Sequence, residues 1–199
     1  MSHTSPLEHR VLHAVRTMGY AATARVAART HAPVDLVAEQ LLDAEAHGWV
    51  TLTSFAGDAG WSLTESGKAH GELLLAAELD ATGARAAVEA AHREFLRHND
   101  PVAAACTAWQ LADLGVGERT PSVAATTTAL QAPAAALAGI ERRLTAHLAR
   151  FSGYHERFTS ALQRARAQPA WITATDRDSC HRVWFELHED LIATLGLSR

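Results

Sequence analysis

The order of secondary-structure patterns between Leu7 and Gly67 constrains the fold more than any other feature of the sequence. Apolar residues recur at helical spacing in three successive stretches, over residues 7–18, 24–30 and 33–47. Apolar and polar residues then alternate at Trp49–Thr53, and a second short β pattern covers Trp61–Leu63. A glycine-bearing turn joins these two patterns, and a further helix starts at Thr64. The sequence therefore predicts three helices, a hairpin and a fourth helix.

Capping residues set the expected helix boundaries. Ser5 and Glu8 have the spacing of a capping box, with Pro6 suited to the first helical position. Thr23 is expected to cap the second helix, and Pro33 to begin the third. The third helix is expected to turn four apolar residues inward, namely Val34, Val37, Leu41 and Leu42. Its outward side then consists of Pro33, Asp35, Leu36, Glu39, Gln40 and Asp43.

Everything after Thr64 has the pattern of helices. The expected helices cover residues 64–79, 82–98, 102–114, 121–151, 154–167 and 176–195. Asn99–Pro101 is expected to break the chain between two of them, and Thr175 with Asp178 forms a last capping box. We therefore expect a mainly α protein with two domains, 1–70 and an all-helical 71–199.

The amino-acid composition limits the classes of protein to which this chain can belong. Apolar residues make up 48% of the 199 residues, enough to bury a core, and the formal net charge is −4. That charge is not typical of a strongly basic nucleic-acid binder. The two cysteines do not form a disulfide framework. No apolar run approaches 18 residues and no signal pattern opens the chain, so we expect a cytoplasmic protein with no membrane contact.

Two segments of the first domain resemble the winged helix-turn-helix domain of MarR-type bacterial transcriptional regulators. Leu41–Val50 resembles the junction of a leucine pair, a glycine and an apolar strand, and Trp61–Gly67 resembles the exit from the wing. Trp184–Leu191 is similar to uncharacterised actinobacterial regulators of this general type. The resemblance implies an N-terminal winged helix-turn-helix with a two-stranded wing, followed by an all-helical C-terminal domain.

The resemblance also implies a homodimer that binds double-stranded DNA and responds to a small apolar or aromatic molecule. Arg25 and Arg29, with His31 in the turn, are the best phosphate contacts, and Gln40 can pair with adenine. The residues expected at the DNA surface are Arg25, Arg29, His31, Pro33, Leu36, Gln40 and Phe55. Three of the six outward residues of the third helix are acidic and none is basic, which opposes phosphate attraction.

The helical remainder carries candidate ligand contacts. One face of the last helix carries His181, Trp184 and His188. One face of the expected helix 102–114 carries Cys106 and Trp109. Aromatic walls with a few polar groups are typical of ligand sites. The alternative for each of these residues is packing in a core.

The sequence resembles a metal motif and a dinucleotide-binding motif only in part, and both are incomplete. His188–Ile192 begins like a zinc-protease motif, but Ile192 stands where the second histidine belongs. Gly115–Gly117 lacks a third glycine and a preceding strand, so it does not predict a dinucleotide site. We expect no catalytic residues, no metal and no cofactor. An adaptor that keeps the winged fold without DNA binding is the main alternative function, and an enzyme is a third.

Overall fold

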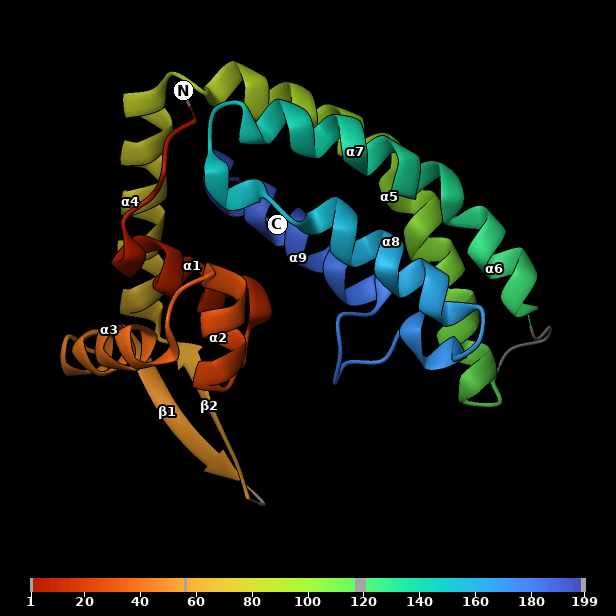
Figure 1. Cartoon of the computed structure of the whole chain (residues 1–199), viewed down its shortest axis with the longest axis horizontal. Helices are drawn as coiled ribbons and strands as arrows, with labels where there is room; N and C mark the ends of the chain where they lie inside the picture. Colours follow the sequence, from red (N-terminus) through yellow and green to blue (C-terminus); the bar gives the residue numbers. More distant parts are fainter. Residues whose placement is uncertain (1, 56, 117–120, 198–199) are drawn as a thin grey trace. The chain divides into compact units, whose positions relative to one another are not determined.

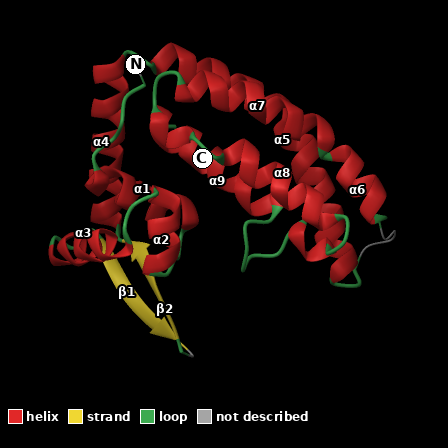
Figure 2. Ribbon diagram, viewed as in Figure 1, coloured by secondary structure: helices red, strands yellow, loops and turns green. Residues whose placement is uncertain are grey.

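The computed structural model describes residues 2–55, 57–116 and 121–197, with the side chain of Phe55 excepted. The chain is mainly helical, with a two-stranded antiparallel sheet after the first three helices (Figure 1, Figure 2). Its elements are α1 (Leu7–Met18), α2 (Thr23–Thr30), α3 (Val34–Ala46), β1 (Val50–Phe55), β2 (Asp58–Leu63), α4 (Glu65–Thr82), α5 (Arg85–Asp113), α6 (Val123–Ala129), α7 (Gln131–Thr145), the short 3₁₀ helix η1 (Ala149–Phe151), α8 (Tyr154–Ala165), η2 (Pro169–Trp171) and α9 (Cys180–Leu195).

The chain divides into two compact units whose bounds differ from the predicted domains. The first unit contains Met1–Arg85, Leu148–Arg150 and Glu189–Arg199, and the second contains Ala86–His147 and Phe151–His188. Residue 70, the predicted domain boundary, lies inside α4. Two short segments from late in the chain therefore belong to the first unit.

The core of the first unit lies between α1, α2, α3 and the hairpin. Val15, Val26, Val37 and Leu41 have no exposed surface, and Trp61 of β2 is 4% exposed. These side chains stand on faces turned toward one another, because α1 contacts α2, α3, α4 and β2. Burial of this apolar surface is the main force that holds the three helices together.

The hairpin has a regular register from end to end. Val50 pairs with Leu63, Leu52 with Trp61, and Phe55 with Asp58. Both strands are longer than the sequence predicted. Gly57 in the turn has a φ of 91°, which glycine adopts without steric cost.

The junction between the hairpin and α4 follows the prediction. Oγ1 of Thr64 accepts a hydrogen bond from the backbone N–H of Gly67 at 3.0 Å, so Thr64 is the N-cap of the helix that was predicted to start there. The Thr64 hydroxyl also lies 2.6 Å from the carbonyl oxygen of Gly48, to which it donates. A Cβ atom at Gly67 would lie 1.9 Å from the carbonyl oxygen of Trp49. Only glycine permits this close approach of α4 to the start of the hairpin.

Three predicted caps are wrong, because tertiary contacts engage the side chains. Ser5 is buried and donates its hydroxyl hydrogen bond to Glu78 rather than capping α1. Thr23 accepts a hydrogen bond from Nε1 of Trp61 at 3.0 Å and does not cap α2. The last helix begins at Cys180, and Asp178 accepts from Nε of Arg157 at 2.8 Å.

The second unit is built from helices. The predicted break at Asn99–Pro101 is wrong, since α5 continues through Pro101. Proline inside a helix loses one hydrogen bond and strains the preceding turn. Phe95 and Val102, on either side of Pro101, are buried at 0% and 1% exposure, and their packing offsets that cost. The predicted helix 121–151 is divided into α6, α7 and η1.

One stretch of the described residues, Val123–Thr145, is long and apolar enough to cross a membrane by length and composition alone. No such stretch was expected from the sequence. Leu130, Leu137, Ile140 and Leu144 from this stretch have at most 1% of their surface exposed. The structure is therefore compatible with a soluble protein.

Candidate functional site

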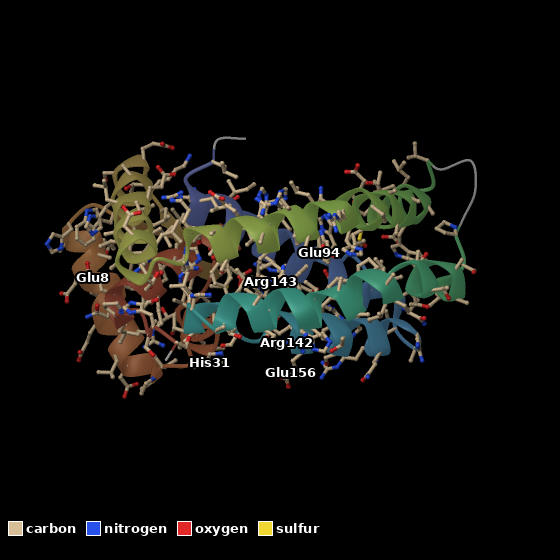
Figure 3. All side chains as sticks on the ribbon, turned by 90° about the horizontal axis from the view of Figure 1, so that it is seen from above. Glu8, His31, Glu94, Arg142, Arg143 and Glu156 are labelled. Atoms are coloured by element: carbon tan, nitrogen blue, oxygen red, sulfur yellow. The ribbon has the colours of Figure 1, made fainter. Side chains whose placement is uncertain are left out.

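The α3 helix has one buried face and one exposed face along its whole length. Val37, Leu41 and Ala44 point into the core and are at most 3% exposed. The turn from α2 into α3 contains His31, an exposed residue labelled in Figure 3, whose φ of 51° lies in the left-handed region. This turn sets the direction in which α3 leaves α2.

The exposed face of α3 is both acidic and apolar. Asp35, Glu39 and Asp43 are exposed, and no arginine, lysine or histidine lies between Val34 and Ala46. Leu36 is 47% exposed and Leu42 is 58% exposed. We call these five side chains the α3 face. Mixed carboxylates and leucines on one helix face form a surface that can bind a macromolecule but does not attract phosphate by charge.

Two of the four residues of α3 that were predicted to face the core are exposed instead. Val34 and Leu42 are 47% and 58% exposed, while Val37 and Leu41 are buried as predicted. The buried face is narrow because α3 packs against α1, α2 and β1 on one side only. Helical spacing alone does not determine how wide that face is.

The other residues predicted for the DNA surface lie on α2, on or just before α3, and at the end of β1. Pro33 is exposed just before α3, and Gln40 is half-buried on the helix. Arg25 and Arg29 are half-buried on α2. Phe55 ends β1, and its side chain lies outside the described part of the chain. The side chains that the sequence grouped therefore belong to α2, α3 and the hairpin, with the two arginines less accessible than Leu36.

A stack of three aromatic rings, which was not predicted from the sequence, fixes the end of α3. The indole of Trp49 lies between His47 and His70, with ring centroids 4.5 Å and 3.8 Å apart. Nδ1 of His47 is 2.8 Å from the carbonyl oxygen of Asp43. The stack joins the segment between α3 and β1, which contains His47 and Trp49, to His70 of α4. No local pattern predicts it, because His70 comes from a different element than its partners.

The predicted ligand residues of the second unit lie in its packed interior. Trp184 is 4% exposed, its ring centroid lies 4.4 Å from that of Phe95 and 5.7 Å from that of Phe158, and Nε1 donates to Oδ1 of Asn99 at 3.1 Å. His188 is half-buried, 5.2 Å from Phe95 between ring centroids. The structure thus brings Trp184 and His188 into one ring cluster with Phe95. These contacts are those of a core.

The remaining ligand residues are less closely grouped. Burial raises the pKa of the Cys106 thiol to about 12, so this thiol stays protonated and unreactive at neutral pH. Burial also lowers the pKa of His181, which favours its neutral form. Trp109 is half-buried on α5, one turn after Cys106.

A buried charge cluster in the first unit was not predicted. The Arg150 guanidinium donates from Nε to Glu78 at 2.9 Å, from NH1 to Asp190 at 2.5 Å, and from NH2 to Thr194 at 2.7 Å. Nε2 of His13 lies 2.8 Å from the same Asp190 carboxylate. The side chains of Arg150, Glu78 and Asp190 are at most 4% exposed. The five residues come from four separate elements, so sequence spacing carries no signal for them.

The charges in this cluster support one another. Burial is the largest single influence and raises the pKa of both carboxyl groups, but the charge of Arg150 with hydrogen bonds from Ser5 and Arg150 together outweigh it at Glu78, and the charges and hydrogen bonds of His13 and Arg150 together outweigh it at Asp190. Both pKa values therefore lie below their ordinary range, and both groups are ionised at neutral pH. Within the residues that the structure describes, no three His, Cys, Asp or Glu side chains converge where a metal ion could bind. The cluster is consequently an internal ion-pair network.

Comparison of the chain with protein-family models, with curated proteins and with solved structures gives no match.

Proposed function

We propose that residues 7–67 form a winged helix-turn-helix and that the protein is a DNA-binding transcriptional regulator. The observation that carries this proposal is the exposed outer face of α3, which follows a tight turn after α2 and precedes an antiparallel hairpin. Winged domains use such a helix in the major groove. The likeness of Leu41–Val50 and Trp61–Gly67 to MarR-type regulators supports the same interpretation.

In this proposal side chains of α3 contact the DNA bases, and side chains of α2 bind the DNA phosphate backbone. Gln40 pairs with adenine, and Leu36 contacts a thymine methyl group. Arg25 and Arg29 neutralise phosphates, and His31 in the turn donates to another. Two copies of the chain place their α3 helices in successive major grooves, about one helical turn of DNA apart.

The carboxylates of the α3 face limit how tightly DNA is bound. Two arginines in each of two copies neutralise about four phosphates, so log K falls with log salt at a slope near −3.6. Asp35, Glu39 and Asp43 repel the backbone, which weakens binding without changing that slope. We therefore expect measurable affinity at low salt and little at high salt.

The test is enrichment of fragmented host genomic DNA on the full chain at about 50 mM salt, where phosphate attraction is strong, followed by fluorescence anisotropy of the enriched fragment. Gln40→Ala is expected to weaken binding about tenfold, since one bidentate base contact is lost. The matched control, Gln163→Ala on the exposed side of α8, leaves affinity unchanged. Failure to enrich any fragment with folded protein rejects the proposal.

A second candidate function is binding of a protein partner by the same helix. The observation in its favour is the combination of two exposed leucines, Leu36 and Leu42, with three carboxylates. A basic amphipathic segment complements that surface, because its apolar side can contact the leucines and its cations the carboxylates.

One variant separates the two functions. The triple substitution Asp35→Asn, Glu39→Gln, Asp43→Asn removes the negative charge and keeps the leucines. If α3 contacts DNA, the variant binds the enriched fragment more tightly than the natural chain, because like-charge repulsion is removed. If α3 contacts a basic partner, the same variant loses that partner. A photo-crosslinking residue at Leu42 in host cells then identifies protein or DNA as the neighbour.

A further inference from the structure

The first unit contains a recess that neither α3 nor the buried charge cluster uses. It has a volume of about 270 Å³ and lies between the last turn of α1, the start of α4 and α9. Its lining comprises Val15, Arg16, Gly19, Leu63, Thr64, Glu65, Lys68 and Glu189. The volume is just below the range of pockets that hold drug-sized ligands, about 300–1,000 Å³. A small metabolite is the size of ligand that fits.

Arg16 is a fixed cation in this recess. Its side chain is 10% exposed, and it donates from Nε to Glu189 at 3.2 Å and from NH1 to Glu72 at 3.0 Å. A guanidinium carries five N–H donors, so these two bonds leave donors for a carboxylate. Because two acidic partners hold its orientation, Arg16 loses little side-chain entropy when it binds a ligand.

Lys68 and Glu65 bring one charge of each sign to the first turn of α4. Both are exposed and lie three residues apart, on one face of the helix. Among the residues for which the structure gives contacts, neither side chain has a hydrogen-bond or ion-pair partner. Lys68 is the single lysine of the chain. Both charges are therefore available to a ligand in solution.

The lining carries balanced charge beside an apolar wall. Arg16 and Lys68 offset Glu65 and Glu189, and Val15 with Leu63 supplies the apolar surface. A simple anion or cation in this recess meets a like charge as well as an opposite one. A zwitterion satisfies both signs at once.

We propose that this recess binds a free α-amino acid with an aliphatic side chain. The carboxylate of the ligand lies between Arg16 and Lys68, its ammonium group faces Glu65, and its side chain contacts Val15 and Leu63. This site is separate from the α3 face, and its occupation does not depend on DNA binding.

The test is isothermal titration of the full chain with L-leucine, N-acetyl-L-leucine and L-leucinamide. L-Leucine is expected to bind saturably, and each analogue, which lacks one of the two charges, about tenfold more weakly or worse, since a charge-assisted hydrogen bond is lost. Glu65→Gln and Lys68→Met are expected to weaken leucine binding to a similar extent. Glu39→Gln on α3 and Arg97→Met on α5 are matched controls outside the recess, and they leave binding unchanged.

The single lysine provides a second readout. Bound leucine is expected to slow the reaction of Lys68 with an amine-directed acetylating reagent, as measured by mass spectrometry of the peptide that contains it. Saturable leucine binding with protection of Lys68 supports the site. The proposal is overturned if leucine does not bind at millimolar concentration, if the two analogues bind as well as leucine, or if Lys68→Met binds as tightly as the natural chain.

Discussion

Nε of Arg150 donates a hydrogen bond to Oε2 of Glu78 at 2.9 Å, although the two residues lie 72 positions apart in the sequence. Arg150 belongs to η1 and Glu78 to α4. The same guanidinium also reaches Asp190 on α9. One buried arginine therefore ties two late segments of the chain to a unit formed mainly by its first 85 residues.

Replacing this arginine is expected to destabilise the first unit strongly. Arg150→Met leaves two buried carboxylates without their cation, and removing one partner of a buried ion pair costs about 3–5 kcal/mol. Urea unfolding followed by circular dichroism measures the loss. The control is Arg97→Met, whose exposed pair with Glu94 contributes at most about 1 kcal/mol. Equal stability of the two variants contradicts the role given to Arg150.

Gly67 and Gly71 both lie in α4, and substitution of each by alanine allows a matched comparison. A Cβ at Gly67 meets the Trp49 carbonyl oxygen at 1.9 Å, whereas a Cβ at Gly71 meets nothing within 4 Å. Gly67→Ala is expected to cost about 2 kcal/mol or more, because the backbone must move. Gly71→Ala is expected to stabilise the helix by up to about 1 kcal/mol, since alanine has the higher helix propensity. Thermal unfolding of the two variants compares them directly, and a Gly67→Ala variant as stable as the natural chain refutes the close approach.

A fall in pH is expected to lower the stability of the first unit, because His9 binds a proton more readily in the unfolded chain. Burial lowers the pKa of His9 to about 4, with the charges of His13 and Arg150 acting in the same direction and Glu78 opposing them. The unfolded chain therefore binds a proton at His9 near pH 6.5, before the folded chain does. The free energy of unfolding falls as pH drops from about 6.5 to 4, by up to roughly 3 kcal/mol.

His9→Gln is expected to flatten this part of the pH profile, because glutamine binds no proton. Urea unfolding at several pH values between 4 and 7 measures the slope. Gln163→Ala on the exposed side of α8 replaces no proton-binding side chain, so it serves as the control and retains the natural slope. The lowered pKa values of Glu78 and Asp190 act mainly below about pH 4.5, where the carboxyl groups of the unfolded chain take up protons that the folded chain does not, and this removes further stability. A His9→Gln variant with an unchanged slope contradicts the assignment.

Trp184 is expected to act as a core residue of the second unit. Its ring packs against Phe95 and Phe158, so Trp184→Ala should cost about 3–5 kcal/mol. Trp109→Ala, at a half-buried position, should cost clearly less. Unfolding followed by circular dichroism measures both. A small loss at Trp184 would favour the ligand role that the sequence suggested for it.

The sequence predicted those parts of the fold that local patterns determine. The hairpin and the start of the fourth helix at Thr64 were correct because their partners lie within about 15 residues. The caps at Ser5 and Thr23 failed because Glu78 and Trp61, both distant in sequence, engage those hydroxyl groups. Capping by a hydroxyl group competes with every other acceptor or donor that the fold brings near it.

In the candidate site, too, some features follow from local sequence patterns and others depend on tertiary structure. The outward position of Asp35, Leu36 and Glu39 follows from helical spacing, and the structure places all three on the exposed face. The exposure of Leu42 depends on how much of α3 its neighbours cover, which spacing does not determine. The Arg150 cluster depends wholly on tertiary structure.

The most direct test of the central proposal is amide hydrogen exchange of the full chain with and without the enriched DNA fragment. We predict that binding slows exchange in α3 (residues 34–46) and in the hairpin (residues 50–63), and leaves residues 86–147 unchanged. Protection confined to the second unit, or no change at α3 while DNA is bound, would contradict the proposal that the exposed face of α3 is the DNA-contacting surface.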